Sequence, residues 1–560
     1  MKLKRWQRIL TLLYCCIIIF LFFSFRLAYL QIARGKILAR DAVRQRAHVV
    51  TLDYNRGDIR DRNGVSLLGG EKEKVLVLFP GLLAKGNPEM LEVVSSLVPA
   101  SSLSEKPSIA LRKLSEHEEK LFKELQCSGV VVAEAQKRYG LQALATHVVG
   151  HVGPEDGEGK VGLELTFNKE LSGSVPHALA AVVDGKNNLI EGLGFRLWGA
   201  SAPYRPYNLV LTIDSNIQKK VEDIMDRRVK RGAAIVINPQ NGDILAMASR
   251  PNYFQANLSD YMRNAENNAS FFEAQPFINR SILSYPPGSV FKIVVAAAAL
   301  ESGNYSPDST FYCPGSVQIG DRLFRCHQNK AHGYITLAQA FAHSCNTTFI
   351  ELAMKLGRKT IYDYALKLGL GQITGIPLGS SVQGGETAGY IPSPQEMPYL
   401  GDLALTAIGQ GRVEATPLQV ACLTSAAVNG GYLIKPRLAG ALQTQDGDEI
   451  KKFPAGEKTR VLSPLTAAQI RFMMLGVVEY GTGKGASNNK LLLGGKSGTA
   501  ETGRLFNGKP QQYSWFSGFW AKGENKAVIT VFVEEATRGS AAELFGTIAK
   551  EIEPELTHSP

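Results

Sequence analysis

The pattern of hydrophobic and polar residues separates an apolar N-terminal segment from a long globular region. Residues 9–25 carry no charge, and basic residues stand immediately before them. At about 1.5 Å per residue this segment nearly crosses the hydrocarbon core of a bilayer, and residues 27–32 can extend it. The basic residues on its N-terminal side predict a cytoplasmic N-terminus and an extracytoplasmic remainder. Because no small-residue cleavage site follows, we expect a single-pass anchor that stays attached rather than a cleaved signal peptide.

Between the anchor and residue 200 the pattern is mixed. Residues 48–53 predict a strand, and Asn63-Gly64 predicts a hairpin-like turn shortly after it. Residues 71–129 are polar and amphipathic, which predicts an inserted helical lobe. No catalytic constellation lies in this region, so we expect a structural role for it.

The remainder of the chain alternates strand and helix patterns. Residues 209–214 predict a strand, and the amphipathic run that ends at Arg228 predicts a helix. Two apolar strands follow at residues 232–238 and 243–249, and the turn between them predicts a hairpin. Three more strands with short connections are predicted near the C-terminus, at residues 494–501, 514–521 and 527–535. Together these patterns predict an α+β fold with a five-stranded antiparallel sheet and helices packed on it.

Composition supports a globular protein of more than one domain. The 560 residues are 44% hydrophobic and 20% charged, which is more chain than one hydrophobic core usually holds and is unlike a disordered tail. The net charge of +11 suits anionic surroundings such as phospholipid or cell-wall polymer. No nucleic-acid-binding motif and no dense basic run accompanies that charge, so we expect no nucleic-acid partner.

The candidate nucleophile is Ser289. Two prolines and Gly288 precede it and predict a loop that leads into a helix. The apolar run of residues 293–300 predicts that this helix is buried on all sides. Ser289 then lies in the first turn with Lys292 on the same face, so a buried amine of lowered pKa can act as a base toward the hydroxyl.

Two later motifs strengthen this assignment, because a Ser-x-x-Lys pair alone arises by chance in a chain of this length. Ser344-Cys345-Asn346 follows a predicted helix, and Lys496-Ser497-Gly498-Thr499 opens a predicted strand. The ordered trio of motifs resembles the signature of penicillin-binding proteins and serine β-lactamases.

Four motifs before residue 200 resemble those of the pedestal domain in class B penicillin-binding proteins. Gly140 stands where that family usually carries proline. The motifs lie at residues 56–64, 138–139, 145–150 and 159–164. We expect their charged residues to form a structural ion-pair network rather than a catalytic site, namely Arg56, Asp61, Arg138 and Glu164.

The resemblance implies a monofunctional peptidoglycan D,D-transpeptidase of the division or sporulation type. The implied fold is a penicillin-binding, β-lactamase-like transpeptidase domain, preceded by a membrane anchor and an elongated mixed pedestal. The domains would be the cytoplasmic tip and anchor at residues 1–32, the pedestal at 33–203 with the lobe 71–129 inserted, and the transpeptidase domain at 204–560. Further landmarks of that domain are expected to serve turns and helix starts, at residues 410–411, 416–419 and 481–483.

The resemblance also assigns the acyl-transfer chemistry. Ser289 would attack the carbonyl carbon of the penultimate D-alanine of a stem peptide and form an acyl-enzyme. Lys292, as a free amine, would take the serine proton, and Ser344 would pass a proton to the leaving D-alanine. An amine of a neighbouring stem peptide would then accept the acyl group, with carboxypeptidase activity as a side reaction. The same serine would bind penicillin covalently.

Binding roles follow from the same resemblance. Asn346 would hydrogen-bond the substrate backbone, and Lys496 would place positive charge beside the terminal carboxylate. Ser497, Gly498 and Thr499 would complete the substrate-binding strand, and backbone N–H groups would form the oxyanion hole. The implied partners are D-Ala-D-Ala stem peptides, β-lactams and a membrane-embedded glycan polymerase, and no metal or organic cofactor is expected.

Two other functions stay open at this point. A β-lactamase or penicillin-sensing protein would use the same trio, usually as a compact domain without anchor and pedestal. A catalytically idle scaffold of a wall-synthesis complex would not need the trio intact. Elongation, division and sporulation are all compatible with the sequence, and the cysteine-bearing second motif leans toward the sporulation enzymes.

Cysteines surround the second motif. Cys345 lies within it, so a disulfide to Cys326 would act on both catalytic neighbours of Cys345. We predict a redox-sensitive Cys326–Cys345 pair, with Cys313 as the competing partner and three unconnected thiols as the alternative. Zinc ligands can also be drawn from this region, but their spacing is not a familiar one and no metal site is predicted; the candidates are Cys313, Cys326, His327 and His332.

Overall fold

The chain forms two compact units whose segments alternate along the sequence. Unit 1 comprises Met1–Asn55, Glu71–Lys137 and Ser174–Tyr204, and unit 2 comprises Arg56–Gly70, Arg138–Gly173 and Arg205–Pro560. Parts of the predicted pedestal therefore pack with the C-terminal region, and the domain boundaries given above stay a prediction. The computed structural model describes residues 2–83, 88–99, 103, 106–124, 129–154, 156–173, 176–199, 205–258, 262, 274–378, 385–506 and 509–558.

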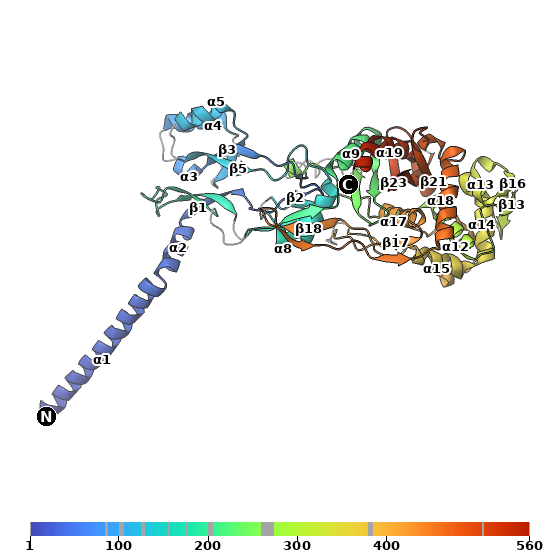
Figure 1. Cartoon of the computed structure of the whole chain (residues 1–560). Helices are drawn as coiled ribbons and strands as arrows, with labels where there is room; N and C mark the ends of the chain where they lie inside the picture. The colour runs from blue at the N-terminus through green and yellow to red at the C-terminus, as the bar shows by residue number, and fades with distance from the viewer. Residues whose placement is uncertain are drawn as a thin grey trace. The chain divides into compact units, whose positions relative to one another are not determined.

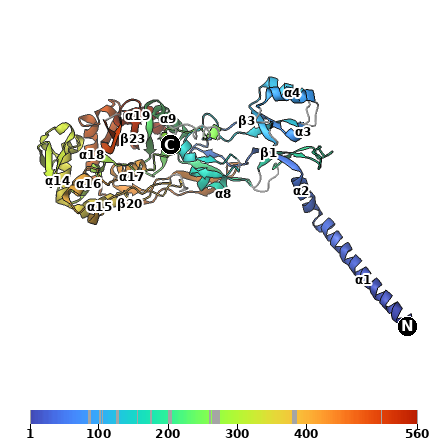
Figure 2. The ribbon, with the colours of Figure 1, turned by 180° about the vertical axis from the view of Figure 1, so that it is seen from behind.

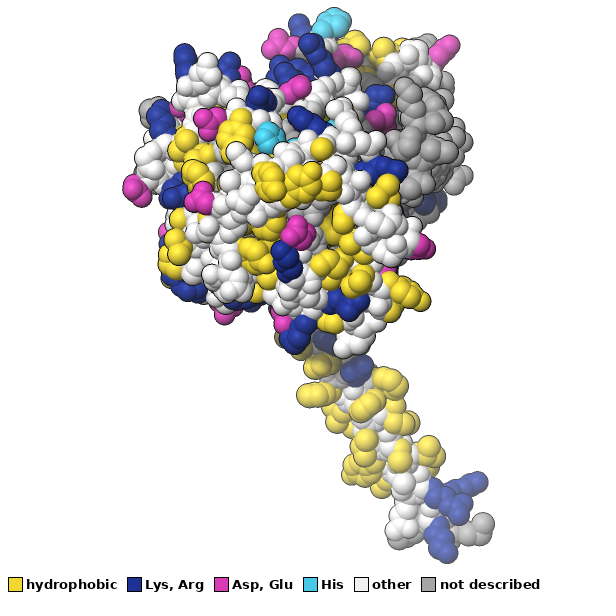
Figure 3. Space-filling view, turned by 90° about the vertical axis from the view of Figure 1, so that its right-hand side faces the viewer, with side chains coloured by type: hydrophobic (Ala, Val, Ile, Leu, Met, Phe, Trp, Pro, Cys, Tyr) yellow, Lys and Arg dark blue, Asp and Glu magenta, His cyan; other side chains and the backbone are white. Residues whose placement is uncertain are grey.

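Unit 1 begins with a long apolar helix. α1 spans Lys2–Ala28, and a π-helical turn at Tyr29–Ala33 and α2 at Gly35–Gln45 follow it. Within the candidate span Lys4–Ala33, the apolar 18-residue window has a mean hydropathy of 2.3 and is not buried against the rest of the protein. Figure 3 shows hydrophobic side chains along this helix and Lys and Arg side chains near its far end. Its length and composition fit a single-pass membrane anchor, as the hydrophobic pattern predicted.

In the described residues, the remainder of unit 1 contains two three-stranded antiparallel sheets (Figure 1). The predicted helical lobe at residues 71–129 is wrong in part, because the apolar run of residues 75–78 is a buried strand rather than a helix. The first sheet has the order β1-β8-β9, with β1 at Ala47–Asp53, β8 at His177–Val182 and β9 at Phe195–Trp198. The second has β3 (Lys72–Leu78) between β4 (Ser108–Arg112) and β5 (Val130–Gln136), and it is joined by α3 (Pro80–Leu83), α4 (Pro88–Leu97) and α5 (Glu116–Glu124).

A five-stranded antiparallel sheet forms the centre of unit 2 (Figures 1 and 2). This sheet confirms the five strands expected from the sequence. α9 (Ser215–Arg228) and α19 (Ala541–His558) pack together on one face, and α17 (Pro417–Val428) and α18 (Pro464–Glu479) pack on the other. The strand order is β12-β11-β23-β22-β21, with β11 at Val229–Ile237, β12 at Ile244–Arg250, β21 at Leu492–Phe506, β22 at Lys509–Lys522 and β23 at Asn525–Ala536.

Shorter elements complete unit 2. A second sheet has the order β19-β18-β10-β2 and pairs the predicted strand near residue 210 with the segment before the Asn63-Gly64 turn. In chain order the elements are β2 (Ile59–Arg60), α6 (Thr146–Val149), β6 (His151–Val152), β7 (Gly159–Val161), α7 (Gly162–Thr166), α8 (Asn168–Leu171), β10 (Asn208–Leu211), η3 (Gln255–Asn257), η4 (Gly288–Phe291), α12 (Lys292–Glu301), β13 (Thr310–Cys313), β14 (Ser316–Ile319), β15 (Arg322–Arg325), η5 (His327–Asn329), β16 (Gly333–Thr336), α13 (Leu337–Ala342), α14 (Asn346–Leu356), α15 (Arg358–Lys367), η6 (Pro394–Glu396), α16 (Leu400–Ala407), β17 (Tyr432–Ile434), β18 (Ala439–Gln443), β19 (Glu449–Lys452), β20 (Lys458–Arg460) and η7 (Lys484–Ala486).

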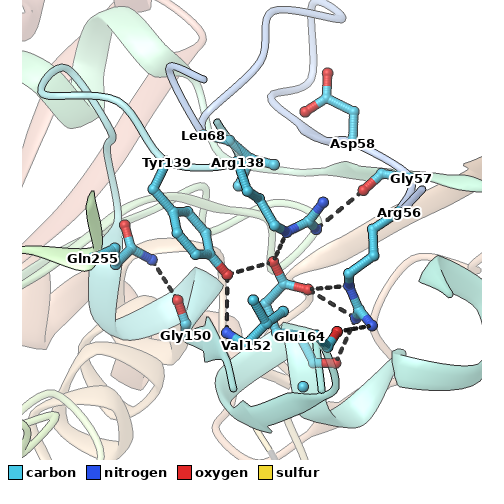
Figure 4. A network of polar contacts seen from close by, with 12 residues as sticks. Arg56, Gly57, Asp58, Leu68, Arg138, Tyr139, Gly150, Val152, Glu164 and Gln255 are labelled. Atoms are coloured by element: carbon cyan, nitrogen blue, oxygen red, sulfur yellow. Dashed lines mark hydrogen bonds and ion pairs between the residues drawn. The ribbon is translucent and has the colours of Figure 1, made fainter. Parts of the chain in front are cut away.

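A buried ion-pair network ties the early segments of unit 2 together (Figure 4). Glu164 is fully buried and accepts hydrogen bonds from Arg56 at 2.9 Å, Arg138 at 2.6 Å and the Tyr139 hydroxyl at 2.8 Å. Burial alone raises the pKa of Glu164, but the two guanidinium groups outweigh it, so the pKa is lowered and the carboxylate stays charged. The predicted structural network is thus confirmed for Arg56, Arg138 and Glu164. It is wrong for Asp61, which instead accepts hydrogen bonds from the first residue of α9.

Candidate active site

The predicted nucleophile lies at the start of a buried helix. Ser289 belongs to the 3-10 turn η4, which runs directly into α12. Every residue of α12 from Lys292 to Leu300 is buried, as the apolar run predicted. Ser289 is half-buried and precedes Lys292 by three positions. Since side chains three apart superpose in a 3-10 turn, the hydroxyl and the amine share one face.

The turn that carries Ser289 packs on strand β21. Gly288 has a φ of +54°, and a Cβ at this position would lie 2.5 Å from the carbonyl oxygen of Thr499, so only glycine fits here. The indole of Trp515 on the neighbouring strand donates a hydrogen bond to the carbonyl oxygen of Pro286 at 3.0 Å. These contacts bring the nucleophile turn beside the strand that carries the third motif.

Lys292 joins the first motif to the second. Its Nζ donates hydrogen bonds to the backbone oxygen of Ser344 at 2.7 Å, to Ser344 Oγ at 3.2 Å and to Asn346 Oδ1 at 2.7 Å. The side chain is fully buried, and no carboxylate in the described part of the chain forms an ion pair with it. Burial lowers the pKa of Lys292 from 10.5 to about 8. A useful fraction of this amine is therefore neutral near physiological pH.

Ser344 lies between two lysines. Its Oγ accepts a hydrogen bond from Lys496 Nζ at 3.0 Å in addition to the one from Lys292. Ser344 follows the end of α13, and its φ is +55°. A non-glycine residue in this left-handed region costs on the order of 1 kcal/mol, and such residues concentrate at functional sites. The turn aims the hydroxyl of the second motif at both amines.

Lys496 lies within β21 rather than at its start. The strand begins at Leu492, so the expectation that the third motif opens a strand is wrong by a few residues. The Lys496 side chain is fully buried, and its Nζ also donates to the backbone oxygen of Ser497 at 3.1 Å. Burial, with the nearby charge of Lys292, lowers the pKa of Lys496 well below its ordinary value.

Two polar residues from segments expected to form turns and helix starts contact the third motif. Thr482 Oγ1 and Ser497 Oγ lie 2.5 Å apart, and Gln410 Nε2 donates to the carbonyl oxygen of Thr499 at 3.3 Å. Gly498 lies against the nucleophile turn, where a Cβ would come within 2.8 Å of a backbone oxygen. Thr482 and Gln410 belong to segments that the family resemblance pointed to, but only the fold shows that they contact the third motif.

The predicted cysteine pair is brought together beside the second motif, without a bond. Cys326 Sγ lies 3.7 Å from Cys345 Sγ and also 3.7 Å from Cys313 Sγ. All three cysteines are free and buried. The geometry therefore does not favour Cys345 over Cys313 as the partner of Cys326, and the redox pair stays a prediction.

The arrangement is suited to covalent acyl transfer. A serine hydroxyl shares a face with an amine of lowered pKa, and a second hydroxyl bridges that amine to a second buried lysine. Such a set can deprotonate a nucleophile and move the proton onward through Ser344.

Comparison with known proteins supplies the family context. Residues 232–552 match the family described as penicillin binding protein transpeptidase domain. The chain is 30% identical to Stage V sporulation protein D of Bacillus subtilis, over 99% of this chain and 86% of that protein. It is 28% identical to the peptidoglycan D,D-transpeptidase MrdA of Acinetobacter baumannii, over 94% of this chain and 84% of that protein.

Solved structures share the fold. A D,D-transpeptidase domain of a peptidoglycan glycosyltransferase from Eggerthella lenta superposes with a TM-score of 0.65 at 24% identity, covering 89% of this chain and 98% of that chain. Penicillin binding protein 3 from Mycobacterium tuberculosis complexed with ampicillin gives a TM-score of 0.65 at 24% identity, covering 91% of this chain and 96% of that chain. The α+β transpeptidase fold expected from the sequence is thereby confirmed.

Proposed function

Because this chain belongs to the penicillin-binding protein transpeptidase family, we propose that it cross-links peptidoglycan stem peptides through a serine acyl-enzyme and binds β-lactams covalently at the same serine. The relative from Acinetobacter baumannii is named a peptidoglycan D,D-transpeptidase. The observation that carries the proposal is the position of the Ser344 hydroxyl, which accepts hydrogen bonds from two fully buried lysines.

In the acylation step, Ser289 Oγ attacks the carbonyl carbon of the penultimate D-alanine while the neutral Lys292 amine takes the hydroxyl proton. Ser344 passes a proton to the amine of the departing terminal D-alanine, and its two lysine contacts set the direction of that transfer. The C–N bond to that residue breaks as the ester to Ser289 forms. An amine of a second stem peptide then attacks the ester, which regenerates the serine and closes the cross-link.

Substrate binding falls to the remaining motif residues. Asn346 orients the substrate backbone, and the terminal carboxylate lies at Lys496 with Ser497 and Thr499 beside it. Backbone N–H groups at Ser289 and Thr499 stabilise the oxyanion, which agrees with the close approach of the nucleophile turn to β21.

The anchor places this chemistry at the membrane. The N-terminus lies in the cytoplasm and the transpeptidase domain, residues 204–560, lies outside, because basic residues precede the apolar helix. A membrane-embedded glycan polymerase that supplies uncross-linked strands is the expected partner. Protease protection of a C-terminal tag in intact and opened cells tests the orientation, and mass analysis of the extracted protein tests whether the anchor stays attached.

Labelling with a fluorescent penicillin tests the activity. Wild type should label stably, and Ser289→Ala should not label. Ser284→Ala is the matched control, because Ser284 lies in the same loop but contacts Glu414 instead of the motif residues. Rapid release of the label would identify a β-lactamase instead, and an unlabelled wild type would favour the scaffold. Following a tagged copy through growth and sporulation distinguishes elongation, division and spore-cortex synthesis.

A further inference from the structure

Four side chains with metal-binding atoms gather beside the second motif. They come from four separate points of the chain: the end of β13, the residue after β15, the residue before β16 and the residue before α14. Their ligand atoms all lie within 4.8 Å of one another, and three of the four residues are buried. The residues are Cys313, Cys326, His332 and Cys345.

The distances within this cluster fit a tetrahedral ion. Zinc with Zn–S bonds of about 2.3 Å holds its sulfur ligands about 3.8 Å apart, whereas a disulfide holds them about 2.05 Å apart. Cys326 Sγ lies 3.7 Å from the sulfur atoms of both Cys313 and Cys345, and Cys313 Sγ lies 3.2 Å from His332 Nδ1. One disulfide would use two of the three sulfurs and leave the third thiol and the imidazole without a role. We propose that Cys313, Cys326, His332 and Cys345 form a zinc site.

The surroundings of the cluster supply what a thiolate site requires. The Thr348 hydroxyl donates to Cys345 Sγ at 3.3 Å, and the Thr347 hydroxyl lies 3.2 Å from the same sulfur. Hydroxyls in this position stabilise metal-bound sulfur and fix the ligand geometry. The cluster also links two sheets of only two strands each, β13 with β16 and β14 with β15, which are marginal on their own. A bound ion therefore has a structural task here.

The site reaches the catalytic motif through two of its ligands. Cys345 separates Ser344 from Asn346, both of which contact Lys292. Asn346 Nδ2 also donates to the backbone oxygen of Arg325 at 2.8 Å, and the next residue is the ligand Cys326. The ion would thus hold the backbone on both sides of Asn346. Its role is to position the second motif and not to contact substrate.

The cluster differs by one histidine and one cysteine from the zinc ligands that could be drawn from the sequence. His327 follows Cys326 directly but is exposed, whereas His332 lies at the cluster. Cys345, which belongs to the second motif, also lies at the cluster. The pair His327 and His332 therefore offers one ligand and one matched control of the same residue type.

Metal content of the full-length protein in detergent tests the site. Purified under reducing conditions without chelator, wild type and His327→Asn should each carry about one zinc per chain by mass spectrometry. His332→Asn and Cys313→Ser should carry at least tenfold less. Cobalt added to the metal-free wild type should give the visible absorption bands of a tetrahedral thiolate site, a readout that needs no variant to fold. Three results would overturn the proposal. The wild type could be purified without metal and give no cobalt spectrum, or both histidine variants could lose zinc equally. A Cys326–Cys345 disulfide in protein purified under reducing conditions would also contradict it.

A second readout separates this site from the proposed function. Chelation should slow penicillin acylation at least tenfold, and added zinc should restore the rate. Zinc binding without any acylation would leave the metal site standing and sink the transpeptidase. Acylation that is rapid in protein without zinc and unchanged when zinc is added would show that the cluster does not position the second motif.

Discussion

The cluster around Glu164 and the cluster around Lys292 both place charged side chains in the interior of unit 2. At Glu164 the carboxylate is compensated by two guanidinium groups and a phenol. At Lys292 and Lys496 the contacts are neutral: a backbone oxygen, hydroxyls and one amide oxygen. A buried group that is paired with opposite charges, such as Glu164, stays ionised. A lysine that is buried among neutral hydrogen-bond acceptors can lose its proton and become uncharged.

The two clusters should therefore change the free energy of unfolding in different ranges of pH. The pKa of Glu164 is lowered by its arginines, so its stabilising contribution is present above its unfolded pKa and is lost as pH falls. The pKa of Lys292 is lowered by burial, from 10.5 to about 8. The unfolded chain then binds more protons between those values, so stability should rise with pH across that interval. Loss of the Glu164 ion pairs therefore lowers the free energy of unfolding at acid pH. Burial of Lys292 lowers it at neutral pH.

The largest expected effect is on chemistry at Lys292. Lys292→Arg keeps a cation of similar reach but cannot supply a neutral amine near neutral pH. Penicillin acylation should fall at least about a thousandfold, measured by stopped-flow with a chromogenic β-lactam. Lys484→Arg, at an exposed lysine of η7, should leave the rate unchanged. Substantial acylation by the Lys292 variant would mean that the two clusters do not differ in the way described.

The next effect is on stability at the other cluster. Glu164→Gln leaves two arginines without their buried counter-charge, so the free energy of unfolding should fall by about 3–5 kcal/mol. Urea denaturation measures the loss, and the variant should also lose less stability than wild type on acidification. Glu158→Gln, at an exposed position in the same region, should change stability little. Acylation per folded molecule should match wild type in both, and a specific loss of acylation in Glu164→Gln would join the two clusters functionally.

The active-site cluster was largely predictable from the sequence. Three short motifs carry Ser289, Lys292, Ser344, Asn346 and Lys496, and their order is informative because acyl transfer needs these groups at fixed places on one fold. Three of the five strands were also predictable, because β11, β12 and β23 each carry a largely apolar run of strand length. The structure brings Lys292 and Lys496 to the Ser344 hydroxyl, a contact that the motifs alone did not predict.

What escaped the sequence depends on contacts between distant segments. Asp61 belongs to the same motif as Arg56, yet it pairs with the start of α9 and not with Glu164. His327 is closer in sequence to Cys326 than His332 is, yet the chain turns at residues 327–329 and presents His332. In both cases the local sequence identifies the type of residue, but the tertiary fold determines which residue it contacts.

A pH profile sharpens the comparison further. If Lys292 must be neutral to act, the acylation rate should rise through an apparent pKa near the value of about 8 set by its burial. Below that value the neutral fraction falls tenfold per pH unit, so the rate at pH 6 should be about a hundredfold below the plateau. The Glu158→Gln and Glu164→Gln variants should follow the same profile. An acylation rate that does not change from pH 6 to 9 would contradict the role of neutral Lys292 as the base.

The smallest effect tests whether the neutral contacts around the lysines matter individually. Thr482 Oγ1 lies 2.5 Å from Ser497 Oγ, next to the backbone oxygen that accepts from Lys496. Thr482→Val removes this hydrogen bond and the longer one that Thr482 Oγ1 donates to the backbone oxygen of Ala342 at 3.3 Å, while keeping the shape of the side chain. A hydrogen bond of about 1 kcal/mol corresponds to a loss of roughly fivefold in acylation rate. Thr482→Ser keeps the hydroxyl and should restore most of the rate, which separates the hydrogen bond from packing. Because Thr482 is exposed, neither change should alter the free energy of unfolding by more than about 0.5 kcal/mol. If valine and serine act alike, the hydroxyl pair is incidental, and the contrast with the Glu164 cluster rests on the two lysines and Ser344 alone.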